Sequence, residues 1–161
     1  MKNVAIWIAI AIVFAIYNTV TRADRDDSGA VVDAGRIDAF QMKVGDCFND
    51  STAMTSDTEF EVSSVAGVPC ADPHDNEVYA IFDVGVDSYP EGDGMSELAF
   101  NSCLKRFEPF VGKDYESSSL DILPMYPTLQ SWKQRDDREV ICAVYDMTLA
   151  KLEGSVSGLG L

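Results

Sequence analysis

Basic residues and histidine are scarce in this chain. Its 161 residues include 12 Lys and Arg against 27 Asp and Glu, which gives a formal net charge of -15 at pH 7. A chain this acidic repels phosphate backbones and anionic lipid headgroups. The composition therefore predicts no nucleic-acid partner and favours cationic partners. One histidine, His74, is also too few for most metal and nucleophile sites, which combine several histidines or cysteines.

The cysteines lack the close spacing of zinc and redox motifs. Gaps of 23, 33 and 39 positions separate Cys47, Cys70, Cys103 and Cys142. Structural zinc sites usually contain C-x₂₋₄-C pairs, and thioredoxin-like centres contain C-x-x-C. The sequence therefore predicts neither a metal site nor a redox centre. An even cysteine count behind an apolar N-terminus instead predicts disulfides in an oxidising compartment.

Long apolar runs are absent from the sequence except at the N-terminus. Residues 4–20 form one such run, and as a helix it would be roughly 25 Å long, a little short of a hydrocarbon core. We expect residues 1–23 to be a single transmembrane anchor with the following domain outside the cytoplasm. A cleaved signal peptide is the alternative, although the residues before Ala23 fit a cleavage site poorly. Residues 24–39 are polar, acidic and contain glycine, which predicts a flexible linker.

Residue patterns in the remaining chain predict an α+β fold. The segments with strand character are Val44–Phe48, Phe60–Val65, Glu77–Val84, Leu120–Leu123 and Arg138–Asp146. An amphipathic helix is expected to begin at Ser96, to run to about Glu108 and to stop by Gly112. This order favours a small antiparallel sheet with one packed helix. Residues 157–161 are expected to be a loose tail.

Four cysteines allow three disulfide pairings. Cys103 lies on the apolar stripe of the predicted helix, and Cys142 lies on one face of the last predicted strand. A helix packed on the sheet would bring these two positions together, and Cys47 and Cys70 would then join neighbouring strands. We therefore predict the disulfides Cys47–Cys70 and Cys103–Cys142.

Two polar segments are candidate binding surfaces. In the turn before the third predicted strand, His74 could act as a general base or a metal ligand, but a histidine in such a turn more often bonds the backbone or a carboxylate. In the predicted loop at residues 132–138, the indole of Trp132 could stack on a sugar or a peptide. More often such a tryptophan caps the edge of the core, while Arg138 pairs with an acidic residue. The candidate residues are His74, Asp75, Glu77, Trp132, Arg135 and Arg138.

Catalytic and cofactor motifs are missing from the sequence. It contains no Gly-x-Ser-x-Gly elbow and no complete EF-hand loop with its distal glutamate. We therefore predict no catalytic residue, no cofactor and no metal. A small envelope hydrolase that uses His74 with neighbouring carboxylates is the alternative from another functional class.

Several short motifs, taken in order, resemble a known family. They are Val44-Gly45-Asp46-Cys47-Phe48, Val68-Pro69-Cys70, Pro73-His74-Asp75, Glu77-Val78, Cys103 in the predicted helix, Pro127-Thr128 before Trp132, Asp137-Arg138 before Val140 and Cys142, and Gly154-Ser155. Over about residues 40–156 the chain resembles the septum-formation domain of bacterial envelope proteins, best populated in actinobacteria. The family tends to have glycine before the Asp-Arg pair, where this chain has Asp136. The resemblance implies an extracytoplasmic four-cysteine domain linked to division septa, and it brings no catalytic residues.

These observations predict a membrane-anchored binding or scaffold domain of the bacterial cell envelope, linked by the resemblance to septum formation or cell division. The expected organisation is an anchor at 1–23, a linker at 24–39, an extracytoplasmic domain at 40–156 and a tail at 157–161. The expected location is the cytoplasmic membrane, with the domain on its outer, periplasmic side. The expected partners are the membrane itself and other envelope proteins or cell-wall components.

Overall fold

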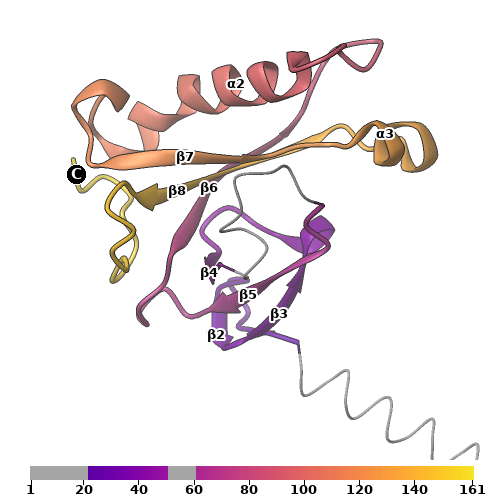
Figure 1. The fold of residues 1–161 in the computed structure, drawn as a ribbon. Coiled ribbons are helices and arrows are strands. Elements are labelled where there is room, and N and C mark those ends of the chain that lie inside the picture. Colours follow the sequence, from indigo (N-terminus) through magenta and orange to yellow (C-terminus); the bar gives the residue numbers. More distant parts are fainter. Residues whose placement is uncertain (1–21, 51–60) are drawn as a thin grey trace, which may run out of the picture.

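The computed structural model describes residues 22–50 and 61–161 of the chain (Figure 1). Residues 1–21 of the predicted anchor lie outside these ranges, as does Phe60, the start of one predicted strand. Within the described ranges, no helix is long and apolar enough to span a membrane.

Six strands form the main sheet, in which every neighbouring pair is antiparallel. Their order across the sheet is β3-β5-β4-β6-β8-β7. The strands are β3 (Gly35–Asp38), β4 (Cys47–Asn49), β5 (Ser64–Val68), β6 (Asn76–Asp83), β7 (Leu120–Met125) and β8 (Glu139–Asp146). Two further strands, β1 (Asp24–Arg25) and β2 (Val31–Asp33), pair separately with each other.

Helices of two lengths accompany the sheet in the described part of the chain. α2 (Gly94–Val111) is the long amphipathic helix, and α3 (Leu129–Arg135) is a short helix that precedes β8. Two 3₁₀ turns, η1 (Ala39–Gln41) and η2 (Tyr115–Ser117), follow β3 and α2. Helices combined with antiparallel sheets confirm the α+β prediction, and α3 is a helix that the sequence analysis did not anticipate.

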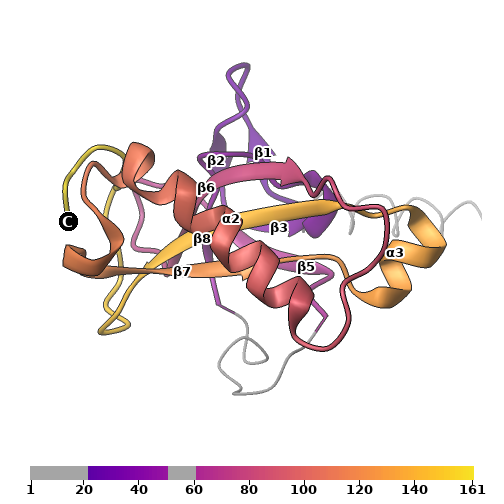
Figure 2. The same ribbon diagram turned by 90° about the horizontal axis from the view of Figure 1, so that it is seen from above.

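The sheet is buried on both faces because it separates two apolar clusters. α2 lies along one face of β6, β8 and β7 (Figure 1 and Figure 2). The other end of the same sheet, with β5 and β3, curls across the opposite face together with β2. Along β8, Cys142 and Val144 belong to the cluster under α2, whereas Ile141 and Ala143 belong to the other cluster. Successive strand residues point to opposite faces, so the alternation in the sequence places consecutive apolar residues in different cores.

Both predicted disulfides are present. Cys47–Cys70 joins β4 to the loop after β5, and Cys103–Cys142 joins α2 to β8. The second bridge lies in the cluster between the helix and the sheet, and both of its cysteines are fully buried. Packing of the helix on the sheet thus brings these positions together, as its apolar stripe indicated.

Residues 24–39 form strands rather than a flexible linker, which corrects the sequence prediction. β1 and β2 pair with each other, and β3 pairs with β5 at one edge of the main sheet. The Arg25 guanidinium makes two bonds to the Asp46 carboxylate, at 2.5 and 2.7 Å, and Asp46 is only 2% exposed. The polar composition misled the prediction because Val31 and Ile37, which enter the core, lie in a short stretch rich in acidic residues, glycine and alanine.

The tail at residues 157–161 packs on the end of α2, whereas the sequence predicted a loose segment. The N–H of Gly158 donates to the carbonyl of Phe110 at 2.7 Å, and the N–H of Gly160 donates to the carbonyl of Val111 at 2.8 Å. The last carbonyls of a helix have no partner within the helix. The tail supplies those partners, and this fixes its position.

Several element boundaries also differ from the sequence prediction, including the start of α2, which lies at Gly94 rather than Ser96. β5 begins at Ser64 rather than Phe60, and α2 continues through Pro109 to Val111. Proline removes a helical hydrogen bond, but Phe107 and Val111 on either side of it are fully buried, so packing outweighs that loss. The helix then ends at Gly112, the predicted stop, whose φ is +84°.

Candidate functional site

The predicted binding surface at the turn before β6 is mostly interior, which corrects the expectation of an exposed turn. His74 is 0% exposed and Glu77 is 1% exposed, while Asp75 is half-buried. Residues 151–156 cover the turn, and the backbones of His74 and Leu152 exchange two hydrogen bonds, at 3.1 and 2.8 Å. The local sequence could not reveal this burial because the covering segment comes 78 residues after Glu77.

The buried polar groups of this turn are bonded to the protein, with one exception. The Glu77 carboxylate accepts the Ser155 hydroxyl at 2.6 Å and the N–H of Val156 at 2.7 Å. The Nδ1–H of His74 donates to the carbonyl of Asp72 at 2.8 Å. The other ring nitrogen of His74, Nε2, is buried and has no hydrogen-bond partner among residues 22–50 and 61–161. Hydrogen bonds therefore fix this turn in place, and the lone pair on Nε2 of His74 is left unused.

Asp75 is the member of this turn that remains at the surface. It forms an ion pair with Lys151 at 2.7 Å and accepts the N–H of Asp50 at 2.9 Å. Partial burial opposes the ionisation of Asp75, but these two bonds outweigh it and lower the pKa of the carboxyl below its usual value. The carboxylate of Asp75 therefore helps to hold the covering segment in place.

The second predicted surface begins as a helix rather than as a loop. Thr128 caps α3, because its hydroxyl accepts the N–H of Ser131 while the Ser131 hydroxyl accepts the N–H of Thr128. Trp132 is then buried, and the Arg138 guanidinium lies 3.5 Å from the centre of its ring. Arg138 also donates to the carbonyls of Trp132 and Asp137. Through these contacts the side chains of Trp132 and Arg138 both stabilise the end of α3.

The position at which the chain departs from the family pattern has a left-handed backbone. Asp136 ends α3 with a φ of +54°, a region that glycine enters freely and aspartate enters more readily than most residues. Its carboxylate also pairs with Arg138 at 2.7 Å. Aspartate thus adopts the turn that glycine would form at this position.

The two predicted surfaces lie at opposite ends of the sheet. In the β6–β8 pair, Asn76 lies opposite Tyr145 at one end, and Asp83 lies opposite Glu139 at the other. The turn with His74 adjoins the first end and α3 adjoins the second, so roughly 20 Å of strand separates them. The six candidate residues therefore do not form one site.

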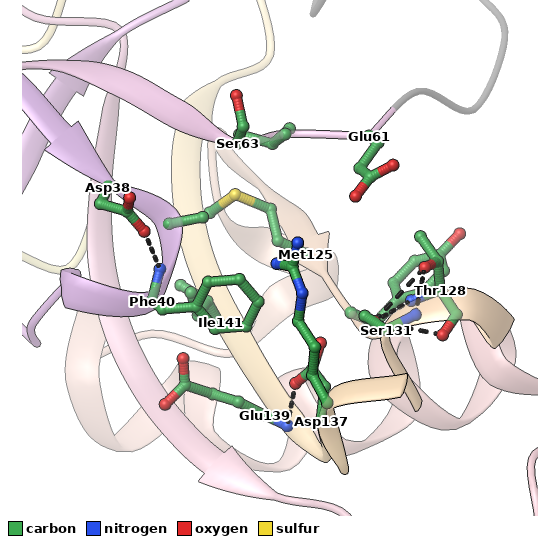
Figure 3. Close-up of a pocket in the computed structure, with 14 residues that line it drawn as sticks. Asp38, Phe40, Glu61, Ser63, Met125, Thr128, Ser131, Asp137, Glu139 and Ile141 are labelled. Atoms are coloured by element: carbon green, nitrogen blue, oxygen red, sulfur yellow. Dashed lines mark hydrogen bonds between the residues drawn. The ribbon is translucent and has the colours of Figure 1, made fainter. Parts of the chain in front are cut away.

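A cavity of about 330 Å³ opens at the α3 end (Figure 3). Its lining comes from the end of β3 with η1, from residues 61–63 before β5, from the end of β7, and from α3 with the start of β8. We call it the edge groove, because β3 and β7 are the two outer strands of the main sheet. Of the residues that the sequence analysis singled out, Arg135 lines this groove.

The edge groove has an apolar centre and an acidic border. Met125 lies in the middle of Figure 3, near Phe40 and Ile141. Phe40 is 52% exposed, and the Arg135 guanidinium lies 5.5 Å from the centre of its ring. The carboxylates that border the groove are Asp38, Glu61, Asp137 and Glu139. This combination suits a ligand with an aliphatic part and a positive charge.

Repulsion between carboxylates makes a cation favourable in the groove. Asp137 and Glu139 lie on the side of the groove opposite Glu61 (Figure 3). Burial raises the pKa of Glu139, and the charges of Asp137 and Asp83 raise it further. A bound cation would relieve this repulsion, whereas an anion would add to it.

The edge groove offers charged and hydroxyl groups to a ligand. Its polar lining consists of carboxylates, hydroxyl groups and the Arg135 guanidinium. His74, the one histidine of the chain, is buried at the other end of β6. A hydrolase that uses His74 would need that base within reach of a substrate, and this conformation does not provide it.

Most of the groove was missed by sequence reasoning because its residues come from distant segments. Phe40 follows a predicted linker, Glu61 lies in a predicted strand, and Met125 lies just beyond another. One signal was available in the sequence: Phe40 is a large aromatic residue directly after a polar, acidic stretch. That signal indicates that the chain packs against the domain at Phe40, but it does not show which segments surround Phe40.

Comparison with known proteins agrees with the motif resemblance. A family model described as septum formation matches residues 44–158, which is more than half of the chain. The matched range includes all four cysteines of the two disulfides, and it confirms the resemblance. No curated protein and no solved structure gives a significant match.

Proposed function

Since the chain belongs to the septum-formation family and has a role related to septum formation or cell division, we propose that it acts there as a binding module. In this proposal, residues 1–23 anchor the chain in the cytoplasmic membrane and the domain lies on the outer side. The edge groove then docks a basic, partly apolar segment of an envelope protein. The domain performs no reaction of its own.

The edge groove is the observation that supports this binding role. A lysine or arginine of the partner would lay its aliphatic stem on Met125 and Ile141 and place its charge near Glu139. Each buried methylene contributes about 0.8 kcal/mol, and each partly exposed ion pair contributes up to about 1 kcal/mol. These contributions are small, so the docking would be weak and reversible, as suits a component of a transient assembly.

A peptide with one central lysine flanked by leucines should bind the full-length protein, and the same peptide with glutamate at the centre should not. The double substitution Glu61→Gln/Glu139→Gln should weaken binding roughly tenfold, because it removes two attractions of about 0.7 kcal/mol each. Titration calorimetry of the protein with each peptide measures this difference.

The matched control is Glu97→Gln/Glu116→Gln, which makes the same change in net charge at two exposed positions outside the groove. Equal weakening by both double substitutions would show that only the overall acidity matters, and the groove proposal would then fail. Binding should also weaken as the pH falls, because protonation removes the attracting charges. This loss should begin at a higher pH than for an ordinary glutamate, since the pKa of Glu139 is raised.

The proposed location is supported by the apolar run at residues 4–20 and by the disulfides, which persist in oxidising compartments. We expect the protein to remain in the membrane pellet after an alkaline wash, with a mature N-terminus before residue 4 by mass spectrometry. A soluble form that begins near Asp24 would replace the anchor with a cleaved signal peptide. Such cleavage would also remove the N–H of Ala23, which donates to the carbonyl of Arg36 in β3.

A further inference from the structure

The buried turn before β6 holds a cluster of groups that the binding proposal does not use. A ring nitrogen of His74, a carboxylate oxygen of Glu77 and the Sγ of Cys47 all lie within 4.8 Å of one another. All three residues are buried, and Cys47 is bonded to Cys70. Imidazole nitrogen, carboxylate oxygen and cysteine sulfur are the atom types that zinc binds in proteins.

We propose that reduction of the Cys47–Cys70 disulfide turns this cluster into a site for one zinc-class divalent cation. The ligands are the two thiolates, Glu77 and His74. The sequence analysis set zinc aside because no two cysteines are closely spaced, but the fold brings Cys47 beside a turn in which Cys70, His74 and Glu77 follow one another closely.

The geometry of His74 is the strongest support for this site. Its Nδ1–H donates to the carbonyl of Asp72, so the lone pair of the ring lies on Nε2. That atom is buried and has no hydrogen-bond partner in the described part of the chain. A buried polar atom without a partner is costly. Metal-binding histidines usually donate their other N–H to a carbonyl or carboxylate in this way.

Glu77 is also oriented as a ligand would be. Ser155 donates to one carboxylate oxygen and the N–H of Val156 donates to the other, and each oxygen keeps a second lone pair. Zinc lies about 2.0 to 2.3 Å from its ligands, so neighbouring ligand atoms are about 3.3 to 3.8 Å apart. The atoms of Cys47, His74 and Glu77, which lie within 4.8 Å of one another, therefore need to move by roughly 1 Å or less. The sulfur of Cys70, now bonded to that of Cys47, would have to move away from it to the distance between neighbouring ligands.

The disulfide and the metal exclude each other at this site. In the oxidised protein the two sulfur atoms are bonded together and carry no thiolate charge. A dithiol reductant transfers two electrons, which yields two protein thiols and one reductant disulfide. Metal binding then releases the two thiol protons. In the reverse direction, an oxidising disulfide accepts the two electrons and the cation is released, so the metal can hold this turn only before oxidation.

Cobalt is the probe for this proposal because tetrahedral Co²⁺ bound to thiolate absorbs visible and near-ultraviolet light. The full-length protein, reduced with a phosphine, should bind one equivalent of Co²⁺ with this absorption, and Zn²⁺ should displace it. His74→Gln should weaken the binding at least tenfold, and Cys47→Ser/Cys70→Ser should abolish it. The oxidised protein is the matched control and should show no such absorption.

A second measurement keeps the test decisive if the reduced protein unfolds without metal. Zn²⁺ should then restore the circular dichroism of the reduced wild type but not that of reduced His74→Gln, because metal binding would drive folding. The proposal is overturned if the reduced protein gives no tetrahedral cobalt spectrum. It is equally overturned if His74→Gln binds as tightly as the wild type, or if Cys47→Ser/Cys70→Ser still binds.

Discussion

Replacing Cys103 and Cys142 together with alanine should lower the free energy of unfolding by about 4 kcal/mol. The bridge joins positions 39 residues apart, and opening it returns that loop to the unfolded chain as conformational freedom. It also connects α2 to β8 inside the larger apolar cluster. Loss of the bridge therefore weakens the attachment of the helix that covers one face of the sheet.

Urea denaturation under non-reducing conditions measures this change. The matched control is Asn101→Ala, an exposed substitution on α2, which should change the free energy of unfolding by less than about 0.5 kcal/mol. If the double alanine variant unfolds at the same urea concentration as the wild type, the Cys103–Cys142 bridge does not stabilise the fold in solution.

Replacing Arg25 with methionine should lower the free energy of unfolding by about 3 kcal/mol. The substitution keeps the apolar stem but leaves the Asp46 carboxylate, which is 2% exposed, without its cation. Removing one partner of a buried ion pair typically costs about 3 to 5 kcal/mol, and the lower figure applies here because Arg25 is partly exposed. Asp46 would keep the N–H of Lys43 as a donor.

Arg36→Met is the matched control for Arg25→Met, because Arg36 is an exposed arginine in the neighbouring strand β3. It should change the free energy of unfolding by less than about 0.5 kcal/mol. Equal urea midpoints for the two variants would mean that β1 is not held to the domain through Asp46. Residues 24–39 would then behave as the flexible linker that their composition predicts.

Local residue patterns were sufficient to predict the centre of the fold. Alternation located β6 and β8, and the apolar stripe located α2 and placed Cys103 toward the sheet. These patterns depend on neighbours within a few positions, and burial acts on such neighbours together. The α+β class and both disulfides followed from them, because the faces of a helix and a strand determine which cysteines can meet.

The segments that cover the centre could not be predicted in the same way. Arg25 meets Asp46 across 21 positions, and Ser155 meets Glu77 across 78 positions. No periodicity within the segments at 22–38 or 151–161 indicates these partners, so the polar composition of the segments predicts flexibility. Burial of the His74 turn was missed for the same reason, because the segment that covers it, residues 151–156, comes from the far end of the sequence.

The candidate site depended even more strongly on distant segments. Arg135 was singled out because charge and an aromatic residue occur together in one short stretch. Phe40, Glu61 and Met125 reach the same groove from three other parts of the chain. A cavity between the two outer strands of a sheet depends on how the sheet curves, and single-segment patterns contain no information about that curvature.

Because residues 24–39 fold into the domain, they cannot act as a spacer that lets the domain move away from the proposed membrane anchor. A flexible linker of that length would have an average span of roughly 20 Å, whereas here the chain joins β1 at Asp24 and is held by Arg25 one residue later. With the proposed anchor, this short connection would keep the domain close to the membrane surface. Its partner would have to approach the membrane surface, which favours another membrane-associated protein over distant wall material.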